Sequence, residues 1–86
     1  MAEYVRYPQN ARLYKVPENI SLEQALLIEP YSCAKHAVDR AEITSADVVV
    51  ISGAGTLGLG MITYASQFKP AKLIVLDMME ERLKKA

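Results

Sequence analysis

The stretch VVVISGAGTLGLGMITYASQF, from Val48 to Phe68, decides which fold class this chain belongs to. It begins with four β-branched aliphatic residues and a serine, and this unbroken run predicts a strand that is buried on both faces. All four glycines of the chain follow within eight residues, Gly53 to Gly60. From Thr56 onward, apolar residues recur at helical spacing. The stretch therefore predicts a strand, a glycine-rich turn and a helix in direct succession.

A second strand and a second helix are predicted after this stretch. LIVLD, residues 73–77, is another apolar run, and it ends in an acid. MMEERLKKA, residues 78–86, has the pattern of an amphipathic helix, with Glu81 and Lys85 one helical turn apart. Alternating strands and helices predict an α/β fold with a parallel sheet. Because two parallel strands are too few for an independent sheet, we expect these 86 residues to be a segment of a longer protein.

The beginning of the chain is predicted to be extended. Residues 1–16 alternate loosely between polar and apolar side chains, and Pro8 and Pro17 are expected to end two strands because proline lacks the N–H donor. Ser21, with Gln24 three residues later, forms a capping-box pattern. A short helix is therefore expected to follow directly after the serine.

Two helices are predicted between the extended segment and the first buried strand, over residues 22–28 and about 30–40. Pro30 disfavours helical geometry at Glu29, yet it suits the first turn of a new helix. Glu29 would then lie at the joint between the two helices, which is an unusual place for a carboxylate. The residues expected on the buried side of the second helix are Cys33, Ala34, Ala37 and Val38.

The charge balance and the cysteine content narrow the classes of function. Lys plus Arg and Asp plus Glu each number 10, so the net charge is zero and nothing favours nucleic acid or a membrane as a partner. The single cysteine, Cys33, excludes an intrachain disulfide and a multi-thiolate zinc site. It fits a reducing compartment, and no signal peptide is apparent, so we expect a cytoplasmic protein. The four glycines argue against a membrane span over residues 48–68.

The glycines form the pattern GxGxxG at Gly53, Gly55 and Gly58. Alone this pattern is weak, but here it follows a predicted buried strand and opens a predicted helix. Asp77 ends the next strand, and its distance from Gly58 (77 − 58 = 19 residues) is close to that of the ribose-binding acid in dinucleotide sites. Gly60 falls outside the motif, and close packing of its helix is the role that the sequence offers for it.

Each part of this motif has a physical role in binding a dinucleotide. Gly53 permits a turn that a side chain would forbid, and Gly55 lets the backbone approach a pyrophosphate. Gly58 lets the helix pack closely on the strand. The free N–H groups around Thr56 and Leu57 would face the anion at the positive end of the helix dipole.

The acid after the second strand predicts which cofactor is bound. Asp77 can accept the hydroxyl protons of a ribose, and its charge repels a 2′-phosphate, so NAD is favoured over NADP. Arg82, five residues later (82 − 77 = 5), is expected to pack along the adenine ribose and is poorly placed to neutralise a 2′-phosphate.

Two alternatives remain open for the glycines. They could serve a tight strand-to-helix turn without any ligand. The segment could also bind S-adenosylmethionine, since methyltransferases place a glycine-rich loop after the first strand and an acid after the second, although their loops usually lack the third glycine. A Walker P-loop is excluded because no Gly-Lys-Ser/Thr follows.

With these motifs, the chain resembles the zinc-dependent medium-chain dehydrogenases, most of all the sorbitol and polyol branch, with threonine dehydrogenase nearby. The resemblance covers essentially all 86 residues, and AEY, VPENIS, EP and the glycine motif with its acid are its most specific parts. It implies the end of a GroES-like β domain over residues 1–20, linking helices over 21–45, and the N-terminal half of an NAD-binding Rossmann domain over 46–86.

The resemblance also implies an activity for the whole enzyme. Zinc polarises the oxygen of a secondary alcohol or polyol, hydride passes to NAD, and the enzyme is a dimer or tetramer. This segment would be incomplete for catalysis alone, because the other zinc ligands and the second half of the nucleotide domain lie outside it. A non-catalytic nucleotide-binding or oligomerisation module on the same fold is the alternative.

The resemblance gives Glu29 a role beside the catalytic zinc, next to the metal or in direct contact with it. The alternative for Glu29 is an exposed acid at the start of the helix that Pro30 opens. Cys33 and His36 are three residues apart, but they match none of the ligand positions of the family. We therefore expect Cys33 to be a small core residue and His36 to pack on its helix or lie at the surface.

Overall fold

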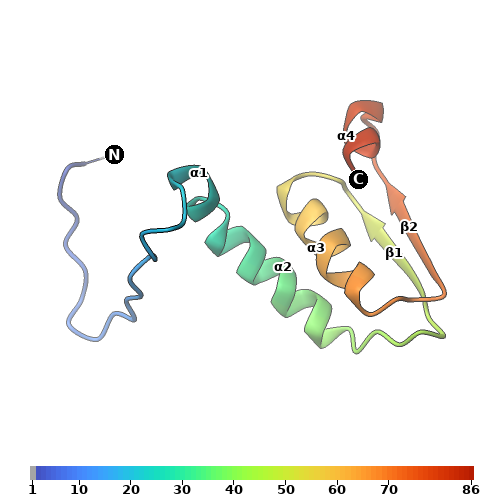
Figure 1. Cartoon of the computed structure of the whole chain (residues 1–86), viewed down its shortest axis with the longest axis horizontal. Coiled ribbons are helices and arrows are strands. Elements are labelled where there is room, and N and C mark those ends of the chain that lie inside the picture. Colours follow the sequence, from blue (N-terminus) through green and yellow to red (C-terminus); the bar gives the residue numbers. More distant parts are fainter. Residues whose placement is uncertain (1) are drawn as a thin grey trace.

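The computed structural model describes residues 2–86 as a small α/β structure (Figure 1). Helices α2 and α3 lie side by side next to a pair of strands, and the N-terminal segment runs away from them. The elements in chain order are α1 (Leu22–Ala25), α2 (Ile28–Arg40), β1 (Val48–Ser52), α3 (Thr56–Gln67), β2 (Lys72–Leu76) and α4 (Glu80–Lys85).

The two strands pair in parallel, which confirms the predicted α/β class and strand direction. The register places Val48 opposite Lys72 and Ser52 opposite Leu76, so both strands end at the same edge of the sheet. Helix α3 connects them and contacts both strands. The predicted order of strand, glycine turn, helix and strand is therefore observed.

The core lies where α2 and α3 meet one face of the sheet. It is centred on Val38 of α2, Ile51 of β1 and Ala65 of α3, which are all buried. Partly buried apolar side chains from β1, α3, β2 and the segment before β1 surround them. Burial of these apolar groups is the main force that holds the helices on the sheet.

The prediction that β1 is buried on both faces is wrong for this structure. Val49 and Ile51 point toward the helices, whereas Val48 and Val50 are 61% and 56% exposed. Successive side chains of a strand point to opposite faces, and α2 and α3 both pack on the Ile51 side. The unbroken apolar run predicted a strand correctly. It could not predict which face of that strand is covered by helices within residues 2–86.

Gly60 allows α2 and α3 to approach each other closely, as its position outside the glycine motif predicted. A Cβ atom on Gly60 would lie 2.9 Å from the Cβ of Ala34 and 3.2 Å from the ring of Tyr31. That ring packs edge-on against Tyr64, with ring centres 6.4 Å apart. The fourth glycine thus belongs to the helix contact and not to the turn.

Helix α1 begins with the predicted capping box. The Ser21 side chain accepts a hydrogen bond from the Gln24 N–H, and the Gln24 side chain accepts one from the Ser21 N–H. The helix ends at Ala25, three residues earlier than predicted. Short helices depend on tertiary contacts for their stability. No residue of α1 is buried, so no packing contact extends the helix.

Helix α2 begins at Ile28, so Glu29 lies in its first turn and not at a joint between two helices. Pro30 is accommodated there because the N–H groups of the first turn have no partner within the helix. The buried stripe of α2 consists of Ala34 and Val38, as predicted. Cys33 and Ala37 are exposed, which corrects their placement in the core. Each precedes a buried residue by one position, and successive residues of a helix point about 100° apart.

The strands predicted within residues 1–16 are absent from residues 2–16 of the structure, and residue 1 lies outside the described part. Turns do occur at both prolines: the Ala11 N–H donates to the Pro8 carbonyl at 3.0 Å, and the Ile20 N–H to the Pro17 carbonyl at 3.2 Å. A strand requires a partner for its backbone hydrogen bonds, and no other part of residues 2–86 pairs with this segment.

Helix α4 is short, and its ion pair joins Glu80 to Lys84 at 3.1 Å in place of the predicted pair of Glu81 and Lys85. Within residues 2–86, no helix has both the length and the apolar character that a bilayer crossing requires.

Candidate functional site

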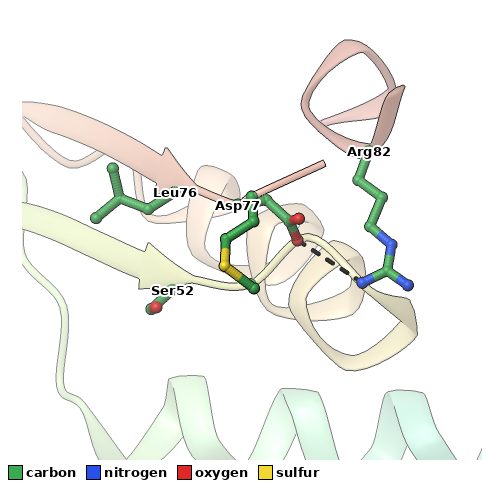
Figure 2. A pocket seen from close by; sticks show the side chains of 6 residues that line it. Ser52, Leu76, Asp77 and Arg82 are labelled. Atoms are coloured by element: carbon green, nitrogen blue, oxygen red, sulfur yellow. Dashed lines mark ion pairs between the residues drawn. The ribbon is translucent and has the colours of Figure 1, made fainter. Parts of the chain in front are cut away.

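A pocket of about 450 Å³ lies at the carboxyl ends of the two strands (Figure 2). It forms there because β1 and β2 end at the same edge, and the chain turns away from the sheet after each strand. In open parallel sheets this edge is where ligands bind. The residues that line the pocket are Ser52, Gly53, Leu76, Asp77, Met78 and Arg82.

The turn after β1 has the backbone conformation that the motif predicted, one that a side chain would disfavour. Gly53 adopts a φ of +100°, a conformation that side-chain-bearing residues rarely adopt. Its N–H donates a hydrogen bond of 2.6 Å to the carbonyl of Leu76. The first glycine therefore both reverses the chain and joins the turn to the end of β2.

The third glycine of the motif leaves no room for a side chain. A Cβ atom on Gly58 would lie 1.8 Å from the carbonyl oxygen of Gly53, which is far inside van der Waals contact. The first turn of α3 thus packs directly against the glycine turn. This confirms close packing as the role of Gly58, with the backbone at the end of β1 as its neighbour.

The beginning of α3 presents free backbone N–H groups. Gly55 is the N-cap, and no side chain caps the helix. The N–H groups of a first helical turn, here around Thr56 and Leu57, lack intrahelical partners and lie at the positive end of the helix dipole. Both residues are exposed, and a Cβ on Gly55 would meet only the Arg82 guanidinium, at 3.9 Å. This arrangement can accept an anion.

Asp77 lies between the glycine turn and α4. Its Oδ2 accepts a hydrogen bond of 2.7 Å from the Ala54 N–H, and its Oδ1 accepts one of 2.8 Å from the Met79 N–H. The Arg82 guanidinium lies 3.9 Å from Oδ2, and Figure 2 shows the two side chains pointing toward one another. The Asp77 side chain is only 7% exposed, so these donors replace water around the carboxylate.

The hydrogen bonds keep Asp77 ionised. The Ala54 N–H is the largest cause, and the Met79 N–H and the Arg82 charge act in the same direction, so together they hold the pKa of Asp77 below its ordinary value. An ionised carboxylate has about four acceptor positions, and two N–H donors leave capacity for the hydroxyls of a ribose. The site thus combines an anion-binding helix start with a charged acceptor for hydroxyl groups.

Glu29 does not lie in this pocket. It is exposed in the first turn of α2, and its Oε1 accepts a hydrogen bond from the Cys33 thiol at 3.3 Å. This bond and the charge of Glu29 raise the pKa of Cys33. His36 is exposed, in agreement with the surface position that the sequence left open. No group of three His, Cys, Asp or Glu side chains within residues 2–86 is arranged to hold a metal ion.

The structure brings Gly53, Asp77 and Arg82 together in one pocket, with Gly55 and Gly58 beside it. The sequence motif did not point to three further lining residues, Ser52, Leu76 and Met78. The signal that could have identified them is their position in the sequence, because Ser52 and Leu76 end the two strands and Met78 follows Asp77. The rule that ligands bind at the carboxyl ends of parallel strands could have found them.

The fold and pocket define the chain as a parallel α/β unit with a glycine turn at its ligand-binding edge. The chain is 46% identical over 86 residues to erythritol/L-threitol dehydrogenase of Mycolicibacterium smegmatis, covering 100% of this chain and 24% of that protein. It is 40% identical over 81 residues to sorbitol dehydrogenase of Bos taurus, covering 93% of this chain and 23% of the relative. A probable D-xylulose reductase A of Aspergillus fumigatus is 41% identical over 70 residues, or 81% of this chain and 20% of that protein.

These similarities identify the chain as homologous to a segment of the medium-chain polyol dehydrogenase family. The chain spans about a quarter of the length of these curated relatives. No family model matches it.

Proposed function

We propose that these residues form the first half of the NAD-binding domain of an NAD- and zinc-dependent dehydrogenase that oxidises a secondary alcohol or polyol. The observation that supports it most is the meeting of the glycine turn and Asp77 in one pocket, 23 residues apart in sequence and joined by a 2.7 Å hydrogen bond. The relatives, which are named for erythritol, sorbitol and xylulose, suggest a polyol as the substrate.

In this proposal the adenine-side ribose of NAD lies beside Asp77, and the pyrophosphate lies over Gly55 at the start of α3. Gly55 carries no Cβ, so a phosphate oxygen could approach its backbone and the N–H groups of Thr56 and Leu57. Arg82 borders the same space and would pack along the ribose. The charge of Asp77 would disfavour a 2′-phosphate, which supports NAD over NADP.

The zinc site of the proposed enzyme would be built by residues outside this segment. A catalytic zinc needs three protein ligands, and residues 2–86 offer no such group. Glu29 is a single exposed carboxylate whose hydrogen-bond partner is the Cys33 thiol. We propose that it becomes a neighbour of the zinc when the remainder of the enzyme covers the start of α2.

The exposed apolar surfaces fit a larger protein. Residues 1–20 would complete a GroES-like β domain, residues 21–45 would link the domains, and residues 46–86 would begin the Rossmann domain. The outward face of β1, with Val48 and Val50 exposed, would then be covered by the second half of that domain. A dimer or tetramer of the whole enzyme belongs to the same proposal.

The proposal is tested on the longest natural chain that contains these residues. We expect saturable binding of NAD by calorimetry, with weaker binding of NADP, and formation of NADH with erythritol, sorbitol or xylitol. A zinc chelator should abolish turnover while NAD still binds. Binding of S-adenosylmethionine without binding of NAD would contradict the proposal, and NAD binding without turnover on any secondary alcohol would leave a non-catalytic nucleotide-binding module.

Glu29→Gln tests the zinc-neighbour role within the same chain. We expect kcat to fall about tenfold or more while the Kd for NAD stays within about twofold, because the residue lies outside the pocket at the strand ends. Glu23→Gln is a matched control, since Glu23 is also an exposed acid in a first helical turn. An unaltered rate for Glu29→Gln would assign Glu29 to the helix start alone.

A further inference from the structure

The Asp77 carboxylate makes a contact that binding of a ribose does not require. It accepts a hydrogen bond from the N–H of Ala54, a buried residue between the first two glycines of the motif. The preceding N–H, of Gly53, donates to the Leu76 carbonyl. Two successive N–H groups of the glycine turn are therefore bound to two successive residues at the end of β2.

Apart from these two hydrogen bonds and the close contact between the Gly53 carbonyl and Gly58, the turn has few restraints on its conformation. No atom lies within 4 Å of the position where a Cβ of Gly53 would be, and glycine is the residue with the greatest backbone freedom. The carboxylate, by contrast, is well fixed, because the Met79 N–H holds its second oxygen and water is largely excluded. A charge-assisted hydrogen bond in such surroundings is stronger than a neutral one in water.

We propose that Asp77 is a positioning residue for the glycine turn in addition to its role as a ribose acceptor. By holding the Ala54 peptide, it fixes the direction in which the turn leads into α3 and presents the N–H groups of Thr56 and Leu57 to a pyrophosphate before any ligand arrives. This inference deepens the proposed function and rests on it.

A ligand without a ribose distinguishes the charge of Asp77 from its positioning role, because the two predict opposite changes in affinity when Asp77 is removed. Asp77 is negative and lies beside the anion-binding end of α3, so charge alone predicts that its removal strengthens the binding of a bare pyrophosphate. Loss of Asp77 would also release Arg82 from its ion pair, which acts in the same direction. If Asp77 positions the turn, its removal weakens the binding of pyrophosphate instead.

The experiment uses inorganic pyrophosphate as the probe and the longest natural chain that contains these residues. Asp77→Ala removes both acceptor oxygens, and Asp77→Asn keeps one. Glu81→Gln is the matched control, because it removes a negative charge near the end of β2 from an exposed side chain without a hydrogen bond or ion pair recorded in residues 2–86. Calorimetry gives the Kd for pyrophosphate, and hydrogen exchange measured by mass spectrometry follows the peptide that contains Ala54.

For Asp77→Ala we expect exchange at Ala54 to become about tenfold faster and the affinity for pyrophosphate to fall about three- to tenfold. Asp77→Asn should give intermediate values, and Glu81→Gln should leave exchange at Ala54 unchanged. Exchange around Ala65, at the far end of α3, is the internal reference and should not change.

Unchanged exchange at Ala54, or unchanged or tighter binding of pyrophosphate by Asp77→Ala, would overturn the positioning role. Faster exchange that includes Ala65 would also overturn it, because it would show a general loss of stability. In these cases the wild-type protein would still bind NAD and the proposed function would stand. A wild-type protein that fails to bind NAD would instead remove the proposed function, and this inference with it.

Discussion

Residues 2–20 and residues 48–77 both contain stretches with the composition of strands, but only the second region forms a sheet. In the second region β1 and β2 are each other's partners, and α2 and α3 cover one face of the pair. In the first region the apolar side chains are exposed, with Tyr4 at 89% and Tyr14 at 86%, and its backbone hydrogen bonds close two local turns at Pro8 and Pro17. A pattern of side chains becomes a strand only where a second segment can accept its backbone hydrogen bonds.

The same difference explains where the candidate site lies. The pocket forms where two paired strands end together and the chain between them is held by buried contacts. Its polar groups are organised by the segment itself: Asp77 by two N–H groups, Gly53 by the Leu76 carbonyl. Glu29, at the exposed start of α2, has the Cys33 thiol as its hydrogen-bond partner. An organised candidate site and an isolated candidate residue thus occur in one chain.

The largest expected effect comes from a methyl group at the most crowded point of the well-packed region. Gly58→Ala would place a Cβ 1.8 Å from the Gly53 carbonyl oxygen, so α3 or the glycine turn must move. Alanine gains about 1 kcal/mol of helix propensity over glycine, but the clash with fixed backbone outweighs it. We expect a loss of about 3 kcal/mol of unfolding free energy, measured by urea unfolding, and loss of NAD binding.

Gly55→Ala is the matched control for this change. Its Cβ would meet only the flexible end of Arg82 at 3.9 Å, so the unfolding free energy should change by less than about 1 kcal/mol. If Gly58→Ala and Gly55→Ala lowered the unfolding free energy equally, the close contact between Gly58 and the Gly53 carbonyl would be contradicted.

A smaller loss is expected at the contact between the two helices. Gly60→Ala would bring a Cβ to 2.9 Å from the Cβ of Ala34, a contact that the helices can relieve by a small shift. We expect a loss of about 1 kcal/mol after the gain in helix propensity, with NAD binding retained. The double variant Ala34→Gly with Gly60→Ala should lose less unfolding free energy than the sum of the losses of the two single variants, because the smaller residue makes room for the new Cβ. Strictly additive losses would contradict the contact.

The pH dependence of stability should reveal Asp77. Its pKa in the folded chain lies below its value of about 3.9 in the unfolded chain, so its ionised form stabilises the fold above about pH 4, and this contribution is lost as the pH falls through the folded pKa. The difference in unfolding free energy between wild type and Asp77→Asn should be constant from neutral pH to about pH 4 and should narrow below it. A difference that widens on acidification would contradict the described hydrogen bonds.

The smallest effect is expected in the exposed first region. Tyr4→Ala and Tyr14→Ala remove two highly exposed rings, so each should change the unfolding free energy of the 86-residue chain by less than about 0.5 kcal/mol. In the longest natural chain the losses should be larger, because the proposed β domain would bury these rings. A loss above about 1 kcal/mol in the 86-residue chain would mean that the first region packs on the second.

The sequence predicted those features that depend on local pattern. The strand β1, the helical spacing of α3 and the turn that needs a glycine at residue 53 are all encoded within short windows, and the structure confirms them. Val48 and Cys33 are exposed because no other element packs on their side of β1 and α2 within residues 2–86. A short sequence window does not contain this information. The hydrogen bond from the Ala54 N–H to Asp77 joins residues 23 positions apart. It could not be predicted without knowing that the two strands are paired.

The central claim is that Asp77 and the glycine turn form the ribose and pyrophosphate site of NAD. The most direct test is calorimetric titration of the longest natural chain with NAD and with NADP, in wild type and in Asp77→Ala. We predict that wild type binds NAD more tightly than NADP, and that Asp77→Ala weakens NAD binding and reduces the preference about tenfold or more, since the repelling charge is gone. An unchanged preference in Asp77→Ala would show that Asp77 is not the acid that contacts the ribose.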